Sequence, residues 1–230
     1  MLAYLFDFAS IFYPKFCDEC GKTLIMREKC ICSQCLASLA KTNFHTYKDN
    51  PLEMVFAGRV SIFRAAAFCF FRKENIMQNI IHKLKYKGNK EIGFYLGYLF
   101  GLKLIESEDF NSVDVIIPIP LHKKKQKKRG YNQSEYISRG IAKAMSKQID
   151  TTSLIRIIDT STQTRKSRYH RWENVSEIFK TTKQENLANK HILLVDDIVT
   201  TGATIESAAE QLLNISGTTI SVACLGFAGF

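Results

Sequence analysis

Two adjacent acidic residues followed by a threonine-rich turn form the segment best suited to chemistry. Asp196 and Asp197 come directly after the apolar run Lys190–Val195, which is typical of a strand buried on both faces. A turn containing Gly202 follows, and apolar spacing predicts a helix from about Thr204 to Leu213. Because ligands of open α/β sheets bind at the carboxyl ends of strands, we expect a ligand site in this segment.

The residue types of this segment favour a phosphorylated sugar. Free backbone N–H groups at the turn and helix start bind anions, and the threonine hydroxyls add donors. Gly202 would let the backbone approach a phosphate closely. The paired acids suit ribose hydroxyls, or Mg²⁺ through water. An exposed turn with ordinary helix capping by Thr200 or Thr204 is the alternative, and it leaves the adjacent acids unexplained.

Clustered cysteines near the start of the chain predict a second, metal-binding centre. Two Cys-x-x-Cys pairs, Cys17 with Cys20 and Cys32 with Cys35, have the spacing of a tetrahedral zinc site. Four thiolates leave no open position, so the Zn²⁺ would be structural. Cys30 is a spare that could replace Cys32, at poorer spacing. Disulfides or a redox pair are the alternatives, which a reducing compartment and the absence of a surrounding βαβ pattern disfavour.

Two basic windows together hold as many basic residues as the whole net positive charge of the chain. The net charge is +10, with 32 Lys and Arg against 22 Asp and Glu. His122–Arg129 holds six of the basic residues and Arg165–Arg171 holds four, and neither window contains an acid. Such clusters favour a polyanionic partner, either phosphate-rich small molecules or nucleic acid, over the alternative of solvated loops. The expected nucleic-acid contacts are Lys123, Lys124, Lys125, Lys127, Lys128, Arg129, Arg165, Arg168 and Arg171.

Aromatic residues adjoin both basic windows. Tyr131 follows the first window, while Tyr169 and Trp172 lie in or beside the second. Aromatic rings next to cations suit single-stranded nucleic acid, because bases stack on the rings while phosphates pair with the cations. Packing in the core is the alternative for these rings.

Composition and periodicity predict a globular α/β protein with a small appendage. The 230 residues are 46% hydrophobic and 23% charged, which is typical of a soluble chain. We expect a cytoplasmic protein without membrane insertion, because no apolar run reaches the roughly 20 residues that span a bilayer and no basic leader precedes the first apolar residues. Residues 1–50 would form the zinc-binding module and 51–230 the α/β domain.

Strands that alternate with helices predict a doubly wound, mostly parallel sheet flanked by helices. The lysine run is expected to form a loop between a strand and a helix. Expected strands are Ser61–Phe71, Val113–Ile117, Leu154–Ile158, Lys190–Val195 and Thr218–Phe227. Expected helices are Glu74–Lys85, Glu91–Ser107, Asn132–Ser146 and Thr204–Leu213.

The segment Val195–Thr204, VDDIVTTGAT, resembles the phosphoribosyl pyrophosphate (PRPP) motif of type I phosphoribosyltransferases. The resemblance implies that Asp196 and Asp197 contact the ribose at the reaction centre, with Mg²⁺ bound alongside PRPP. It implies that the 5′-phosphate is held by Thr200, Thr201, Gly202, Ala203 and Thr204. By analogy with this fold, the Pro118–Leu121 turn, with Pro118 and Ile119, would hold the pyrophosphate.

The order of further motifs resembles the ComF family of competence proteins. After the cysteine pairs come Lys83–Gly88 (KLKYKG), Ile117–Pro120 (IPIP), Lys128–Gln133 (KRGYNQ) and Arg171–Val175 (RWENV). Lys166 departs from the family, which usually has a leucine shortly after the Gln-Thr pair. The resemblance implies a natural-transformation protein that binds PRPP and handles incoming single-stranded DNA. An active phosphoribosyltransferase of nucleotide metabolism, or a scaffold whose zinc module docks a helicase-like partner, are the alternatives.

Overall fold

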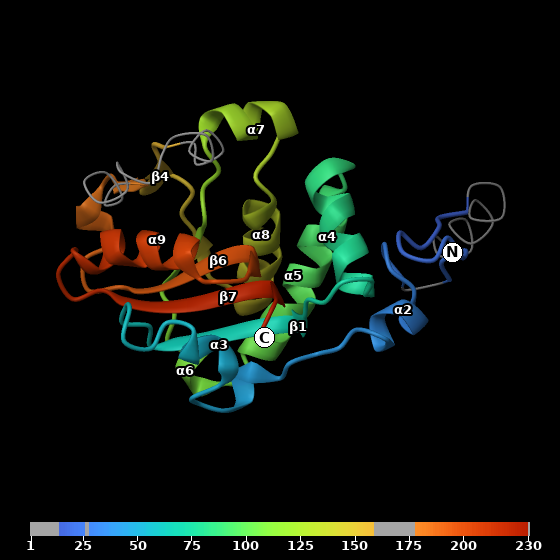
Figure 1. Ribbon diagram of the computed structural model, residues 1–230, viewed down its shortest axis with the longest axis horizontal. Coiled ribbons are helices and arrows are strands. Elements are labelled where there is room, and N and C mark those ends of the chain that lie inside the picture. The colour runs from blue at the N-terminus through green and yellow to red at the C-terminus, as the bar shows by residue number, and fades with distance from the viewer. Residues whose placement is uncertain (1–13, 26–27, 159–177, 230) are drawn as a thin grey trace, which may run out of the picture.

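The computed structural model describes residues 14–25, 28–158 and 178–229 (Figure 1). The strands are β1 Arg64–Phe70, β2 Val115–Pro118, β3 Gln148–Ile149, β4 Leu154–Arg156, β5 Phe179–Thr181, β6 His191–Val199 and β7 Thr219–Phe227. The α-helices are α2 Ser33–Ala37, α3 Pro51–Met54, α4 Ile76–Tyr86, α5 Lys90–Leu104, α6 Glu108–Asn111, α7 Lys123–Arg129, α8 Gln133–Met145 and α9 Ala203–Leu213. Short 3₁₀ turns are η1 Phe44–Thr46 and η4 Gln184–Asn186.

Five strands form one parallel sheet in the order β1-β7-β6-β2-β3. Two interior strands, β6 and β7, are almost continuously buried, which explains their largely apolar sequences. Strands β4 and β5 form a separate antiparallel pair. The predicted mostly parallel sheet flanked by helices is confirmed.

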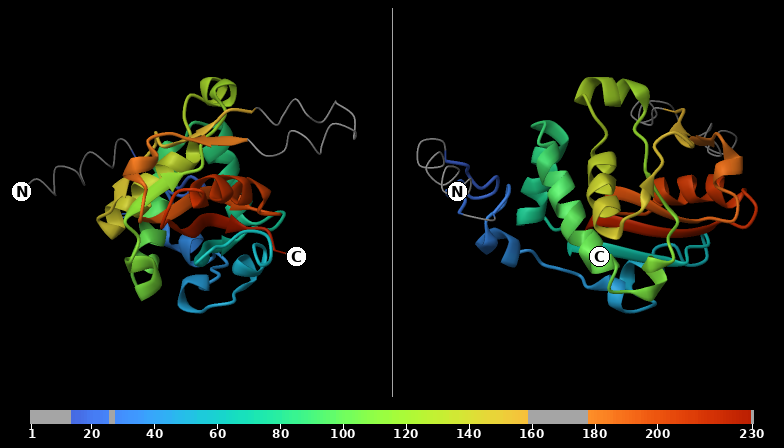
Figure 2. Two further views of the ribbon diagram at one scale, coloured as in Figure 1. Left: turned by 90° about the vertical axis from the view of Figure 1, so that its left-hand side faces the viewer. Right: turned by 180° about the vertical axis from the view of Figure 1, so that it is seen from behind.

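Helices cover both faces of the sheet because the chain winds in two directions. From β6 it passes through α9 to β7, and from β2 it passes through α8 to β3 on the opposite side. Right-handed crossovers in opposite directions place α9 and α8 on opposite faces (Figures 1 and 2). Helix α5 packs on α8, and α8 packs on β2 and β6. The direction changes between β2 and β6, which is where α/β sheets bind ligands.

Two expectations about local structure need correction. The lysine run, predicted as a loop, is the helix α7: the side chain of His122 accepts a bond from the N–H of Lys124, and Gly130 closes the helix at a φ of +81°. Lysine, glutamine and arginine are good helix formers, and these end residues complete the helix. Strand β6 also continues past Val195 to Val199, because Asp196, Ile198 and Val199 pair with β7.

Helices α5 and α8 cross so closely that their backbones nearly touch. A Cβ atom on Gly140 would lie 2.1 Å from the carbonyl oxygen of Phe94, and one on Gly97 would lie 2.2 Å from that of Ile137. Since a backbone carbonyl cannot rotate away as a side chain can, glycine is required at this crossing.

We predict that Gly140→Ala lowers the free energy of unfolding by about 1–3 kcal/mol, because overpacking outweighs the better helix propensity of alanine. The matched control is Gly93→Ala, whose Cβ would meet the flexible end of the Leu84 side chain at 2.8 Å and the Tyr136 Cβ at an ordinary 3.6 Å. This control should change stability by less than about 1 kcal/mol. Urea unfolding measures both variants, and a Gly140→Ala protein as stable as the parent would contradict the crossing geometry.

Candidate functional site

The carboxyl ends of β2 and β6 meet at the point where the sheet changes winding direction. Pro118 pairs with Val195, and the N–H of Ile119 donates to the Val195 carbonyl at 2.8 Å. The Ile119 carbonyl accepts a bond from the Asn132 side chain at 2.9 Å. The structure therefore brings the Pro118–Ile119 turn next to the acid pair, as a ligand spanning both would require.

Asp196 is held by the first turn of α8. Its Oδ1 accepts bonds from the Ser134 hydroxyl at 2.9 Å and from the N–H of Asp197 at 2.8 Å. Burial, with the neighbouring Asp197 charge adding to it, raises the pKa of Asp196 to about 7. The Asp196 carboxyl group is therefore partly protonated at neutral pH. Any cation bound beside it would favour the ionised form.

Asp197 is buried and faces a lysine from α4. Lys85 Nζ lies 3.0 Å from Asp197 Oδ2, an ion pair. Among the described residues, however, no donor reaches this oxygen with hydrogen-bond geometry. A buried carboxylate oxygen with spare acceptor capacity suits a donor from a ligand. Sequence reasoning gave Lys85 no role, although the Lys83–Gly88 motif contained it.

The threonine turn leads into a helix that no side chain caps. Gly202 is the N-cap of α9, with a φ of +77° and no side-chain cap bond, so the alternative of capping by Thr200 or Thr204 is wrong. Within the described part of the chain, the N-cap offers no side-chain acceptor to the first N–H groups of α9, which therefore suit an anion. A small cavity of about 40 Å³ lies along this turn, lined by Asp196 and Ile198–Ile205.

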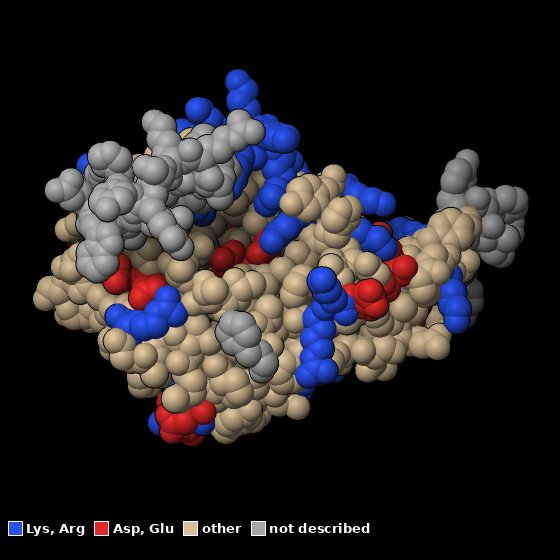
Figure 3. Space-filling view, viewed as in Figure 1, with Lys and Arg blue, Asp and Glu red and all other residues tan. Residues whose placement is uncertain are grey.

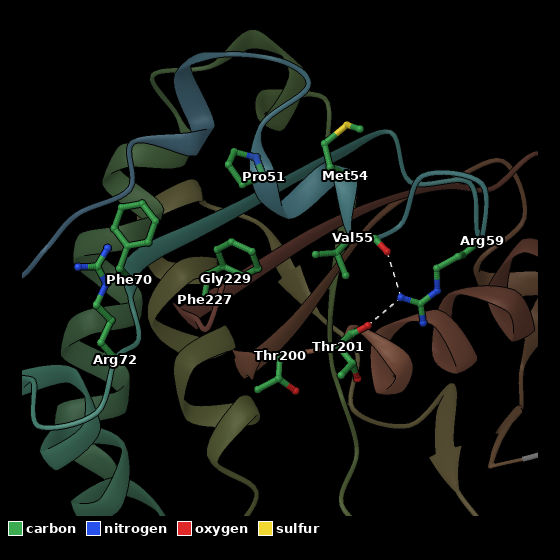
Figure 4. Close-up of a pocket in the computed structure, with 10 residues that line it drawn as sticks. All are labelled: Pro51, Met54, Val55, Arg59, Phe70, Arg72, Thr200, Thr201, Phe227 and Gly229. Atoms are coloured by element: carbon green, nitrogen blue, oxygen red, sulfur yellow. Dashed lines mark hydrogen bonds between the residues drawn. The ribbon is translucent and has the colours of Figure 1, made fainter.

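Helix α3 and Arg59 fix the threonine turn from outside. Arg59 donates to the Thr201 carbonyl at 2.8 Å and to the Val55 carbonyl at 3.0 Å (Figure 4). Arg59 also forms an ion pair with Glu206 on α9. Gly202 packs so tightly that a Cβ there would lie 2.7 Å from Val55. The glycine is therefore required both by its backbone angle and by α3.

A larger cavity of about 620 Å³ opens beside the threonine turn (Figure 4). Val55, Phe70 and Phe227 give it apolar walls, while Thr200 and Thr201 belong to both the cavity and the turn. Sequence reasoning missed this cavity, because its walls come from segments far apart in the chain.

The cysteine cluster has the donor set of a zinc site. The Sγ atoms of Cys17, Cys20, Cys32 and Cys35 all lie within 4.8 Å of one another, and the cysteines are free thiols. Burial opposes ionisation of Cys17, but N–H groups of Cys20 and Cys32 outweigh it and lower the pKa of Cys17 to about 7. Such a cluster could hold a metal such as zinc, which binds thiolates. Cys30 is buried outside the cluster, and burial raises its pKa to about 12.

The first cysteine pair is attached to α4. Glu19, between Cys17 and Cys20, accepts a bond from Asn79 at 2.8 Å and lies 3.7 Å from Lys83 Nζ. Lys83 also donates to the Asp18 carbonyl. Helix α4 therefore contacts the cysteine cluster through Lys83 and the acid pair through Lys85.

The predicted nucleic-acid contacts divide into two groups. All six from the first window lie on α7, where Lys123, Lys124, Lys127 and Lys128 are exposed and Lys125 and Arg129 are half-buried. Figure 3 shows basic side chains gathered over α7, above a hollow in which acidic atoms are visible. Arg165, Arg168 and Arg171, with the neighbouring Trp172, lie outside the described residues. Tyr131 is buried, so packing accounts for it.

Comparison with known proteins agrees with this arrangement. Residues 135–228 match the phosphoribosyl transferase domain family. The competence protein ComFC of Bacillus subtilis (strain 168) is 29% identical over 60% of this chain and 54% of its own length. The chain is therefore similar to a named ComFC competence protein over part of its length. Competence protein F of Haemophilus influenzae is 29% identical over 47% of this chain and 48% of its own.

A DNA utilization protein, YhgH of Escherichia coli O157:H7, is 30% identical over 64% of this chain and 65% of its own length. The chain thus covers less than two thirds of each of these ComF relatives. The resemblance inferred from the ordered motifs is confirmed.

Among the described residues, no helix is long and apolar enough to cross a membrane.

We predict that the full chain binds about one zinc ion through the four clustered thiolates. Cys32→Ala should lose the metal, because three thiolates remain, whereas the matched variant Cys30→Ala should keep it. Elemental analysis of the purified proteins gives the zinc-to-chain ratio. Loss of zinc from Cys30→Ala but not from Cys32→Ala would reverse the ligand assignment.

Proposed function

We propose that this chain binds PRPP with Mg²⁺ between β2 and β6, and that it handles incoming single-stranded DNA in the cytoplasm during natural transformation. The observation that carries the sugar-phosphate part is the buried Asp197 Oδ2, which has no hydrogen-bond donor among the described residues and lies on the strand that leads into the turn before α9. Ribose hydroxyls would donate to Asp196 and Asp197, and the Thr200–Thr204 turn would bind the 5′-phosphate.

The opposite end of the same ligand would lie at the Pro118–Ile119 turn. Because this turn is bonded to Val195, a pyrophosphate there would stand next to the acid pair. Lys85 and the basic residues of α7 supply positive charge on this side. Mg²⁺ would neutralise part of the pyrophosphate charge, with Asp196 and Asp197 as its nearest oxygen donors.

The charge of α7 and the similarity to named relatives support the DNA part of the proposal. Helix α7 carries six cations and no acid, more positive charge than one small ligand needs. The relatives named above are described as competence and DNA utilization proteins. A helicase-like partner that docks on the zinc-binding module stays a prediction, and no observation supports it.

An active phosphoribosyltransferase is the second candidate, and the large cavity favours it. Apolar walls next to the phosphate turn would accommodate a flat acceptor such as a nucleobase. Release of pyrophosphate from PRPP on addition of one nucleobase would support this candidate, whereas binding without release would favour the first.

We predict that Asp196→Asn combined with Asp197→Asn weakens PRPP binding at least about 100-fold, because two charge-assisted interactions are lost. Isothermal titration with PRPP and Mg²⁺ measures the affinity. The matched control combines Glu185→Gln with Glu210→Gln, which removes the same charge at exposed positions. Equal affinity of the acid-pair variant and the parent would refute the ribose assignment.

We predict that replacing Lys123, Lys124 and Lys127 by alanine weakens single-stranded DNA binding and makes it less sensitive to salt. The slope of log K against log salt is negative, and each lost phosphate contact lowers its magnitude by about 0.7, so three lower it by about 2. Alanine keeps α7 helical. The control replaces Lys180, Lys183 and Lys190, which are exposed on other elements. Equal slopes for the parent and the α7 variant would exclude α7 as the contact surface.

A further inference from the structure

A cationic cavity of about 390 Å³ lies between the end of α4 and α7, separate from the cavity beside the threonine turn. Four of the described lining residues are Lys or Arg, and none of those lining residues is acidic. The lining residues are Lys85, Tyr86, Gly88, Lys125, Lys128 and Arg129. Four cations and no acid among the described lining residues of a concave surface favour a phosphate-bearing ligand.

Tyr86 gives this cavity a feature that phosphate alone does not require. It is the last residue of α4, and 69% of its surface is exposed. The Arg129 guanidinium lies 5.6 Å from the centre of the Tyr86 ring, and the His82 ring lies 5.0 Å away. A largely exposed ring held beside a guanidinium is a surface on which another planar group can stack.

Contacts on both sides hold the cavity walls in place. The buried Tyr131 hydroxyl donates to the Leu84 carbonyl, which ties the start of α8 to α4. Arg129 donates to Gln133 of α8, and Lys85 is paired with Asp197. Arg129 and Lys85 therefore stand in position before a ligand arrives, which lowers the entropy cost of binding.

We propose that Tyr86 stacks on a base of single-stranded nucleic acid whose phosphates are bound by Lys125, Lys128 and Arg129. The inference rests on the proposed DNA-handling function and assigns it a contact residue. A small ligand such as pyrophosphate would use the cations but leave the ring without a role. A duplex keeps its bases stacked on each other, so the ring selects unpaired strands.

Fluorescence anisotropy with a labelled oligothymidine and the full chain tests the proposal. Tyr86→Ala should weaken binding about 10-fold, while Tyr86→Phe, which keeps the ring, should bind within about twofold of the parent. Tyr47→Ala is the matched control, because Tyr47 is 45% exposed and lies outside this cavity. Binding of duplex DNA of the same length should be unchanged by Tyr86→Ala.

Three results would overturn the assignment. Equal affinity of Tyr86→Ala and the parent for oligothymidine would remove Tyr86 from the contact while leaving DNA binding intact. An equal loss in Tyr86→Phe would show that the hydroxyl, and not the ring, makes the contact. A matching loss of PRPP affinity by titration calorimetry would place Tyr86 in the sugar-phosphate site. A parent protein that binds no oligothymidine would instead refute the proposed function itself, and the inference with it.

Discussion

Two neighbouring carboxylates at the end of a buried strand repel each other and lose much of their hydration, and the surrounding structure compensates for both costs. Asp196 accepts two hydrogen bonds and has a pKa raised to about 7, so part of its charge is removed by a proton at neutral pH. Asp197 is compensated by the Lys85 ammonium. Through these contacts α8 and α4 help to hold the acid pair at the end of β6.

In the Thr200–Thr204 turn, the groups that suit a phosphate are backbone N–H groups more than side chains. The start of α9 has no side-chain cap, and its turn is fixed by Arg59 and by close packing of Gly202 against Val55. A turn that is already rigid loses little entropy on binding an anion. Helix α3, far from β6 in the chain, is therefore part of the support of the site.

Local patterns predicted the parallel sheet, because the run Lys190–Val195 and the segment Thr218–Phe227 are largely apolar, and cysteine spacing predicted the four clustered thiolates. The loop predicted from the charge of the lysine run is wrong. The prediction neglects the helix propensity of lysine and the closing Gly130. The contact between Lys85 and Asp197 joins residues far apart in the chain, and no local pattern shows it. The same holds for the cavity walls that α3, β1 and β7 share.

Helix α4 presents Lys83 and Lys85 on nearly opposite sides, because residues two apart are separated by about 200° around an α-helix. Lys83 contacts Glu19, between Cys17 and Cys20, and Lys85 forms an ion pair with Asp197 on the other side. A rotation of α4 about its own axis would have to disturb both attachments together. The contacts of α4 with the segment between Cys17 and Cys20 therefore help to set the direction in which the Lys85 ammonium points toward Asp197.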